Sequence, residues 1–445
     1  MMKRFWASSI FIASALALLA GCETTPAGDA AKPATAAASP DNELFIYTVW
    51  PAFYVKEDIF EKQIGQLIKK KFPDIKVKHV HWDNPGRQYK DLLAAGTIPD
   101  IIMDDSQLNM NRYIFDNDLQ YDMRDLIKKY NFDTGKLNPT MMQRMKNVTQ
   151  EGAIYGLPFQ AADFILYYNK DIFDKFGVDY PKPGMTYDEA YELAKKLTRV
   201  EGEVTYKGYS QNPGHYMNYN QLSLDPLHPT EDKVSMTSDG WKKLVDNLRR
   251  FYEIPANQFD TVEKFSQGNI AMAVASSDRI VKFYEDNKNL NFDISTVPYF
   301  SDVPDTKYQP NIYSMYITKQ SKKKDLAFQV MAYLLSEEVQ IQLSKEGIIV
   351  PLQTQAVKDA FGQNLPQLKG KNVASIFSGK YAPAAPARAS GLTYHLAATQ
   401  NVFDPLIFKE SKDSVTALRM IEERETKAIQ TEKAAKDEVK KATGK

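Results

Sequence analysis

The sequence predicts an α/β protein with two lobes, each built on a mainly parallel sheet flanked by helices. About 400 residues follow a low-complexity amino-terminal stretch, too many for one hydrophobic core, and this length favours two. Between residues 44 and 103, short β-prone runs alternate with amphipathic segments. This strand–helix–strand order is typical of a parallel sheet with covering helices.

Five elements of the first lobe can be placed in order. The apolar run 44–50 predicts a buried strand that ends at a proline. The stretch 59–71 has apolar residues on one helical face and three lysines at its end, which complement the helix dipole. A second strand is predicted over 75–80, a short helix over 89–95, and a third strand over 99–103.

Later helices are marked by caps and apolar stripes. Thr186 and Glu189 form a capping box that opens a helix. Apolar residues at helical spacing predict further helices over 241–252 and 326–335, and Ser336 caps another. The segment 415–441 mixes glutamate and lysine at helical spacing and is interpreted as a solvated surface helix.

The first residues have the pattern of a secretory signal peptide, predicted over 1–21. Lys3 and Arg4 precede an uncharged apolar run, and small residues come before Cys22. The apolar run is shorter than a comfortable membrane span, which disfavours a permanent transmembrane helix. Cys22 is the only cysteine, so the secreted chain has no internal disulfide framework.

The sequence Leu19-Ala20-Gly21-Cys22 resembles the lipobox of bacterial lipoproteins. That resemblance implies cleavage before Cys22 and acylation of this residue, with palmitate among the chains, so that the protein is anchored at the extracytoplasmic face of the cell membrane. The alternative is an incidental cysteine beside a signal-peptidase site. Residues 22–42 are rich in alanine, proline, threonine and serine and predict a flexible linker.

The charge of the chain is balanced, with 56 basic and 56 acidic residues. No basic stripe of the kind that binds nucleic acid is evident. Aromatic residues make up 12% of the chain, and many are tyrosines, which suits recognition of a polar ligand.

Four motifs follow one another along the chain: AGTIPDI at 95–101, GAIYGLP at 152–158 with LYYNKDIF at 166–173, FSQGNIAM at 265–272, and SKKK at 321–324. Together they resemble the family 1 extracellular solute-binding proteins, a group that includes maltose-binding protein and many oligosaccharide binders. The likeness keeps family order from about residue 44 to 352 and thins beyond it.

The resemblance implies a hinged, two-lobed periplasmic-binding-protein-like fold of type II. By analogy, the N-lobe comprises 43–160 and 274–315, and the C-lobe comprises 161–273 and 316–445. The family's function implies a monomer that captures a small polar solute, with a carbohydrate or oligosaccharide expected. Closure over the solute is then read by the transmembrane permease subunits of an ABC importer.

Ligands of open parallel sheets lie beyond the carboxyl ends of the strands. Trp50 follows the first predicted strand, and Asp104 and Asp105 follow the third. A tryptophan face can stack on a sugar ring, and a carboxylate can accept two hydroxyl donors. The alternatives are a core tryptophan and a solvated loop.

By analogy with the family, the chain crosses between the lobes near 159–163, 273–276 and 312–318. Further ligand residues are expected at these crossings and in the second lobe. Three of these expectations have a structural alternative: a hinge ion pair for Asp163, a packed tyrosine cluster in the second lobe, and an Asp278–Arg279 ion pair. The resemblance suggests the second-lobe positions, and the carboxy-terminal one comes from the poorly matched end. The candidates are Gln160, Asp163, His215, Tyr216, Tyr219, Ser277, Asp278, Arg279 and Arg388.

No enzyme motif is apparent, because the chain has no nucleophile elbow, no phosphate-binding loop and no His-Glu-x-x-His. His79 and His81 would share one strand face, but no third metal ligand is evident, and no cofactor is expected. Two other functions stay open: a lipoprotein glycoside hydrolase with two distant carboxylates, and a carbohydrate-binding surface adhesin.

Overall fold

A computed structural model describes residues 42–49, 57–84, 88–105, 110, 114–393, 406, 410 and 412–443. The predicted signal peptide, nearly all of the linker, Cys22 and Trp50 lie outside these residues. Within the described residues, no helix is both long enough and apolar enough to cross a membrane.

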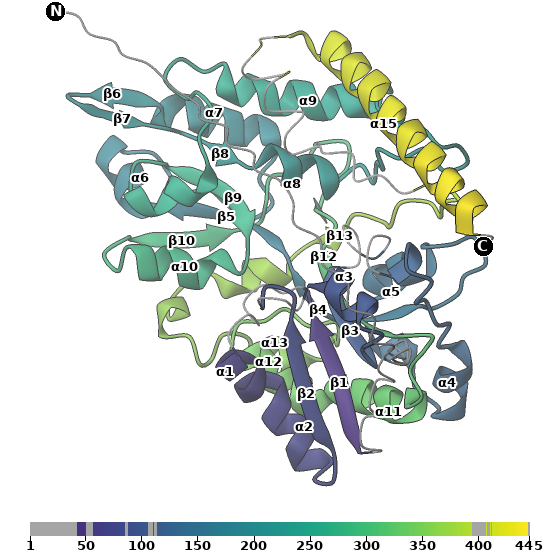
Figure 1. Cartoon of the computed structure of the whole chain (residues 1–445). Helices are drawn as coiled ribbons and strands as arrows, with labels where there is room; N and C mark the ends of the chain where they lie inside the picture. The colour runs from purple at the N-terminus through teal and green to yellow at the C-terminus, as the bar shows by residue number, and fades with distance from the viewer. Residues whose placement is uncertain are drawn as a thin grey trace, which may run out of the picture. The chain divides into compact units, whose positions relative to one another are not determined.

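A five-stranded sheet forms the centre of the first lobe (Figure 1). The strands predicted from the first apolar runs pair in parallel, because helices connect them. Two later strands are antiparallel to their neighbours. The order across the sheet is β2 (Lys76–His81), β1 (Glu43–Thr48), β3 (Ile101–Asp105), β12 (Asn311–Ile317) and β4 (Gly156–Ala162).

Both faces of this sheet are buried, because alternate side chains of each strand point to opposite faces. Leu44 and Ile46 pack with Phe60 in one core, and Phe45 and Tyr47 pack in a second core. The helical elements of this lobe include α1 (Glu57–Phe60), the π-helical turn η2 (Glu61–Gly65), α2 (Gln66–Lys71), α3 (Tyr89–Ala94), α4 (Arg124–Lys129), the 3-10 turn η4 (Thr134–Lys136), α5 (Pro139–Lys146), α11 (Lys324–Leu334), α12 (Glu337–Lys345) and α13 (Gln355–Ala360).

A four-stranded sheet forms the centre of the second lobe. Two of its three strand pairs are antiparallel, although a mainly parallel sheet was expected. β5 enters this sheet directly from β4 of the first sheet after a single residue, Asp163, and both of its neighbours, β10 and β9, run in the opposite direction. Strand direction depends on tertiary pairing, which the local apolar pattern does not specify. The order is β10 (Phe292–Ser295), β5 (Phe164–Asn169), β9 (Met272–Ser276) and β8 (Ser210–Gln211).

The helices of the second lobe pack on this sheet. The predicted capping box is confirmed at the start of one of them, where Thr186 and Glu189 exchange side-chain and backbone hydrogen bonds. The helical elements are α6 (Lys170–Phe176), α7 (Tyr187–Leu197), α8 (Pro213–Asn218), α9 (Asp239–Tyr252), the 3-10 turn η5 (Val262–Gln267), α10 (Arg279–Asp286) and α15 (Ser414–Thr443). Two small ribbons pair β6 (Arg199–Glu201) with β7 (Val204–Tyr206) and β11 (Thr306–Lys307) with β13 (Lys380–Tyr381).

Sheet membership differs from the predicted domain limits in two places. The end of β9, α10 and β10 fall in the range expected for the N-lobe, but β9 and β10 pair with β5 of the second sheet and α10 packs beside them. α11, α12 and α13 fall in the range expected for the C-lobe, but Phe328, Val339 and Val357 belong to the core of the first lobe, together with Leu44 of β1. The pattern of a strand or helix does not say which sheet it joins, because that choice depends on tertiary packing.

Candidate functional site

Strand register brings three polar side chains into one row near the ends of β3, β12 and β4. Tyr313 is paired with Asp105 on one side and with Gln160 on the other. Directly paired residues project from the same face of a sheet. Burial raises the pKa of Tyr313 well above its usual value, and the negative charges of Asp278 and Asp105 raise it further.

Two polar side chains of this region, those of Asp104 and Gln160, are fully buried. Asp104 is 0% exposed, and its carboxylate accepts a hydrogen bond from the backbone N–H of Asp105 at 2.6 Å. Gln160 is 1% exposed, and its side-chain amide has no hydrogen-bond partner among the described residues.

Asp163 lies at the crossing from β4 to β5 and is held from two sides. Its carboxylate accepts hydrogen bonds from Lys307 Nζ at 2.7 Å and from the Tyr381 hydroxyl at 2.6 Å. The exposed fractions are 2% for Asp163 and 13% for Lys307, so the ion pair is largely shielded from solvent. The ribbon of β11 and β13 is therefore tied to the crossing by an ion pair.

The loop after β9 returns to the same crossing. The backbone N–H of Ser277 donates to the carbonyl of Asp163 at 2.7 Å. Asp278 is exposed and accepts a hydrogen bond from the Ser276 hydroxyl. Arg279 forms an ion pair with Glu263 at 3.1 Å. The partner of Arg279 is therefore Glu263 rather than Asp278, the partner considered from the sequence.

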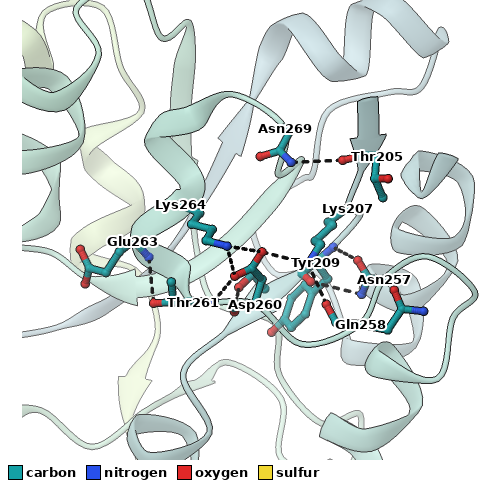
Figure 2. Close-up of polar contacts among 11 residues, drawn as sticks. Thr205, Lys207, Tyr209, Asn257, Gln258, Asp260, Thr261, Glu263, Lys264 and Asn269 are labelled. Atoms are coloured by element: carbon teal, nitrogen blue, oxygen red, sulfur yellow. Dashed lines mark hydrogen bonds and ion pairs between the residues drawn. The ribbon is translucent and has the colours of Figure 1, made fainter. Parts of the chain in front are cut away.

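Glu263 is positioned by a polar network at the start of η5 (Figure 2). Asp260 accepts hydrogen bonds from Lys207 Nζ at 3.0 Å and from Lys264 Nζ at 3.2 Å. Burial alone would raise the pKa of Asp260, but these hydrogen bonds outweigh it, and the net shift is downward. Asn257 joins the same loop to the backbone of Tyr209.

The three aromatic candidates of the second lobe occupy different environments around α8. Asn212 caps this helix and accepts a hydrogen bond from the backbone N–H of His215. Tyr216 and Tyr219 are each 1% exposed and belong to the core. His215 is half-buried against Phe164, and burial lowers the pKa of His215 to about 4, so its ring is neutral at pH 7.

A cavity of about 540 Å³ lies beside this region and draws its lining from both lobes. The first lobe contributes residues after β3 and at the end of α5, and the second contributes the loop after α8. The carboxy-terminal part of the chain closes the remaining side with residues 384–393 and the last turns of α15. The polar lining includes Asp116, Gln120, Arg144, Asn147, Asn218, Asp225, Gln309, Arg388, Ser390, Lys433 and Lys436.

Charges of both signs face this cavity. The side chain of Asp225 is exposed to the cavity but surrounded by protein. Burial raises the pKa of Asp225, and the positive charges of Arg388 and Arg144 offset only part of this rise. Arg144 Nη1 donates to Gln309 Oε1 at 2.5 Å. Hydrogen-bond donors and acceptors together with apolar surface around a cavity suit a hydroxyl-rich small molecule.

The described residues contain no cluster of three or more histidine, cysteine or acidic side chains placed to hold a metal ion. His79, one of the two histidines on β2, has its Nε2 2.8 Å from the Thr48 hydroxyl and stacks on Phe60.

Residues 58–370 match the family described as bacterial extracellular solute-binding protein. The chain belongs to this family. The sn-glycerol-3-phosphate-binding periplasmic protein UgpB of Shigella dysenteriae is 24% identical over 186 residues, which cover 39% of this chain and 42% of UgpB. A binding protein of Brucella abortus is 22% identical over 248 residues, which cover 53% of this chain and 59% of that protein. The chain spans about half the length of these curated relatives.

Solved structures of solute-binding proteins share the fold over most of the chain. The sugar-binding protein MalE of Xanthomonas citri has a TM-score of 0.66 at 16% identity and covers 88% of this chain and 98% of its own. A Listeria monocytogenes ABC substrate-binding protein in complex with cycloalternan has a TM-score of 0.65 at 18% identity, with 87% and 99% covered. The predicted two-lobed fold is thereby confirmed.

Within this solute-binding fold, the predicted ligand residues fall into three groups. Arg388 lines the cavity. Asp105, Gln160, Asp278 and Arg279 lie around Tyr313, and half-buried His215 lies near Asp278 and Arg279, whose charges act on its pKa. The others are placed in the core or in hinge contacts, apart from Trp50, which lies outside the described residues. These others are Asp104, Asp163, Tyr216, Tyr219 and Ser277.

Most of the residues that line the cavity were not predicted from the sequence. Arg144 is the one arginine of the methionine-rich helix α5, and Asp225 lies just beyond the polar, aromatic stretch 212–220. Asp225 could have been predicted, since Asp225-Pro226 continues that polar stretch. Arg144 could not, because nothing in the local sequence distinguishes it from an ordinary surface arginine.

Proposed function

We propose that this solute-binding protein captures a small polar solute, with a carbohydrate expected, and delivers it unchanged to an ABC permease. The observation that carries the proposal is the cavity of about 540 Å³, whose polar lining comes from both lobes. A solute held there contacts both lobes only when they are closed. Its binding energy therefore favours the closed form that a permease can recognise.

The ligand class rests on the chemistry of the lining. Arg144, Arg388, Asn147 and Asn218 offer donors, while Asp116 and Asp225 offer acceptors. A polyhydroxylated molecule can satisfy both kinds at once. Among proteins of the same fold, structures are known with cycloalternan, with mannotriose and with glycerophosphocholine bound, which supports a polar ligand here.

A thermal-shift screen of mono-, di- and trisaccharides with the purified chain tests the proposal. A solute that binds the folded state raises its melting temperature by mass action. We expect at least one sugar to do so in the native chain and to be recovered intact after incubation. Cleavage of the sugar would support the hydrolase alternative instead.

We further propose that Cys22 is the site of a lipid anchor that holds the chain, as a monomer, at the outer face of the membrane. The support is the lipobox-like sequence before Cys22 and the polar linker after it. Metabolic labelling with an alkyne analogue of palmitate tests it: the native chain is expected to take up label in the membrane fraction, and Cys22→Ala to take up none. Equal labelling of both chains would contradict the anchor.

A further inference from the structure

The long carboxy-terminal helix α15 is part of the second lobe. It lies along α9 (Figure 1). Its apolar side chains at helical spacing, including Leu418, Ile421 and Ile429, are buried in the core of that lobe. The Glu422 carboxylate also accepts a hydrogen bond from the backbone N–H of Met236 at 2.6 Å. The helix therefore moves with the second lobe.

Asp232 ties the segment 384–393 and α15 to the same lobe. Its Oδ1 accepts a hydrogen bond from the backbone N–H of Thr393, and its Oδ2 accepts one from Lys433 Nζ, both at 2.6 Å. Arg388 Nε donates to the carbonyl of His228 at 3.2 Å. The two parts of the carboxy-terminal segment are thus fastened to one loop of the second lobe.

The same segment also contacts the first lobe at the rim of the cavity. Lys436 Nζ lies 2.9 Å from Asp116 Oδ1, in the segment that follows β3. The Ser390 hydroxyl donates to Glu151 at 2.8 Å, just before β4.

In a third contact at the same rim, the first lobe supplies the hydrogen-bond donor. Asn147 Nδ2, at the end of α5, donates to the carbonyl of Ala385 at 2.8 Å. Each of the three contacts joins a residue between β3 and β4 to a residue that is fixed to the second lobe. All three must break if the lobes separate.

We propose that residues 384–393 and α15 form a latch that holds the two lobes together over the cavity before any solute binds. The latch deepens the proposed function, since it regulates access to the proposed solute site. Its strength is set by polar contacts that water can replace. The ion pair of Lys436 and Asp116 is partly exposed, with exposed fractions of 34% and 40%. Such contacts bias an equilibrium without locking it.

Interlobe distances in the solute-free chain test the latch. The full chain carries Cys22→Ser, which removes its only cysteine, together with Lys128→Cys on α4 and Lys196→Cys on α7. Both positions are exposed, one on each lobe, and take spin labels for double electron–electron resonance. The variants are Lys436→Glu, which repels Asp116, and the swap of Lys436→Glu with Asp116→Lys. The matched control is Lys427→Glu, the same charge change at an exposed position of the same helix.

We expect Lys436→Glu to shift the distribution to longer distances, with the ratio of closed to open lobes falling roughly two- to fivefold. The swap is expected to restore the native distribution, and Lys427→Glu to leave it unchanged. The latch is overturned if Lys436→Glu matches the native chain, if the swap restores nothing, or if the control shifts equally. Because no sugar is added, these results do not depend on whether the cavity binds one.

Discussion

The carboxylate of Asp163 lies where the chain passes from one sheet to the other, and its partners are fixed. Lys307 and Tyr381 both bond to it, and Lys307 also lies over the Tyr381 ring at 4.0 Å. A buried ion pair is most important when one partner is removed, because the other charge is then left buried without compensation. Asp163 thereby joins the crossing to the ribbon of β11 and β13.

Replacing this carboxylate is expected to destabilise the fold strongly. Asp163→Ala leaves Lys307 buried without its anion, and we expect the free energy of unfolding in urea to fall by about 3 kcal/mol. Asp278→Ala, an exposed carboxylate of the neighbouring loop, is the control and should change it little. Equal effects of the two substitutions would contradict the structural role of Asp163.

Three histidines are held neutral by their surroundings. Burial lowers the pKa of His79 to about 3 and the pKa values of His81 and His215 to about 4, from an ordinary value of 6.5. Below pH 6.5 the unfolded chain therefore binds more protons than the folded chain. Stability is expected to fall as the pH drops from 6.5 toward 4.

His79→Gln tests the histidine contribution, because glutamine does not titrate and can still bond to the Thr48 hydroxyl. Urea unfolding at pH 7.5 and at pH 5.5 is expected to show a smaller loss of stability in this variant than in the native chain. An identical loss in both chains would mean that His79 is already solvated in the folded state.

The sequence predicted the surroundings of some individual residues but not of others. Asp163 was expected either in the cleft or in a hinge ion pair, and the structure contains the ion pair, while its contact with a solute stays a prediction. Asp104 and Asp105 were expected just after the third strand, but both belong to β3, where adjacent positions project to opposite faces of the sheet. Burial of the Asp104 carboxylate could not be predicted, because it depends on helices that cover the sheet.

At the scale of single elements, η5 is positioned by the network around Asp260. Two lysines from different segments, Lys207 and Lys264, meet on this one carboxylate (Figure 2). The turn presents Glu263 to Arg279. The loop before η5 therefore orients Glu263, whose ion-pair partner Arg279 lies near Tyr313.

Asp260→Asn keeps the shape of the side chain but removes its charge. We expect a loss of about 1–2 kcal/mol in the free energy of unfolding at pH 7. Because the pKa of Asp260 is lowered in the folded state, its contribution is present above pH 3.8 and is lost as the pH falls through the folded pKa. The difference between the variant and the native chain is therefore expected to vanish at low pH.

Asp179→Asn, an exposed carboxylate of the same lobe, is the matched control for this substitution. It should leave the unfolding curve unchanged at both pH values. A difference for Asp260→Asn that persists below pH 3 would contradict the assigned charge interaction.

Elements with local signals were predicted well. The capping box of Thr186 and Glu189 and the parallel strands 43–48, 76–81 and 101–105 depend on nearby residues, and the structure contains them. α15 shows the limit of such signals. Its mixed charges suggested a solvated surface helix, but its apolar positions are buried against the second lobe.

For the whole molecule, the cavity depends on four segments that are distant in sequence. Arg144, Asp225, Arg388 and Lys436 come together only when both lobes and the carboxy-terminal segment are in place. No local pattern predicts this arrangement. Family order along 44–352 predicted the two-lobed fold, but the carboxy-terminal part that lines the cavity lies beyond the matched motifs.

Isothermal titration calorimetry tests the central claim most directly. The titrant is the sugar that raises the melting temperature most, and native chain is compared with Arg388→Ala. We predict one binding site per native chain, roughly tenfold or more weaker binding in the variant, and recovery of the sugar unchanged. Equal affinity of the two chains, or heat from continuous turnover, would contradict a solute held and released in this cavity.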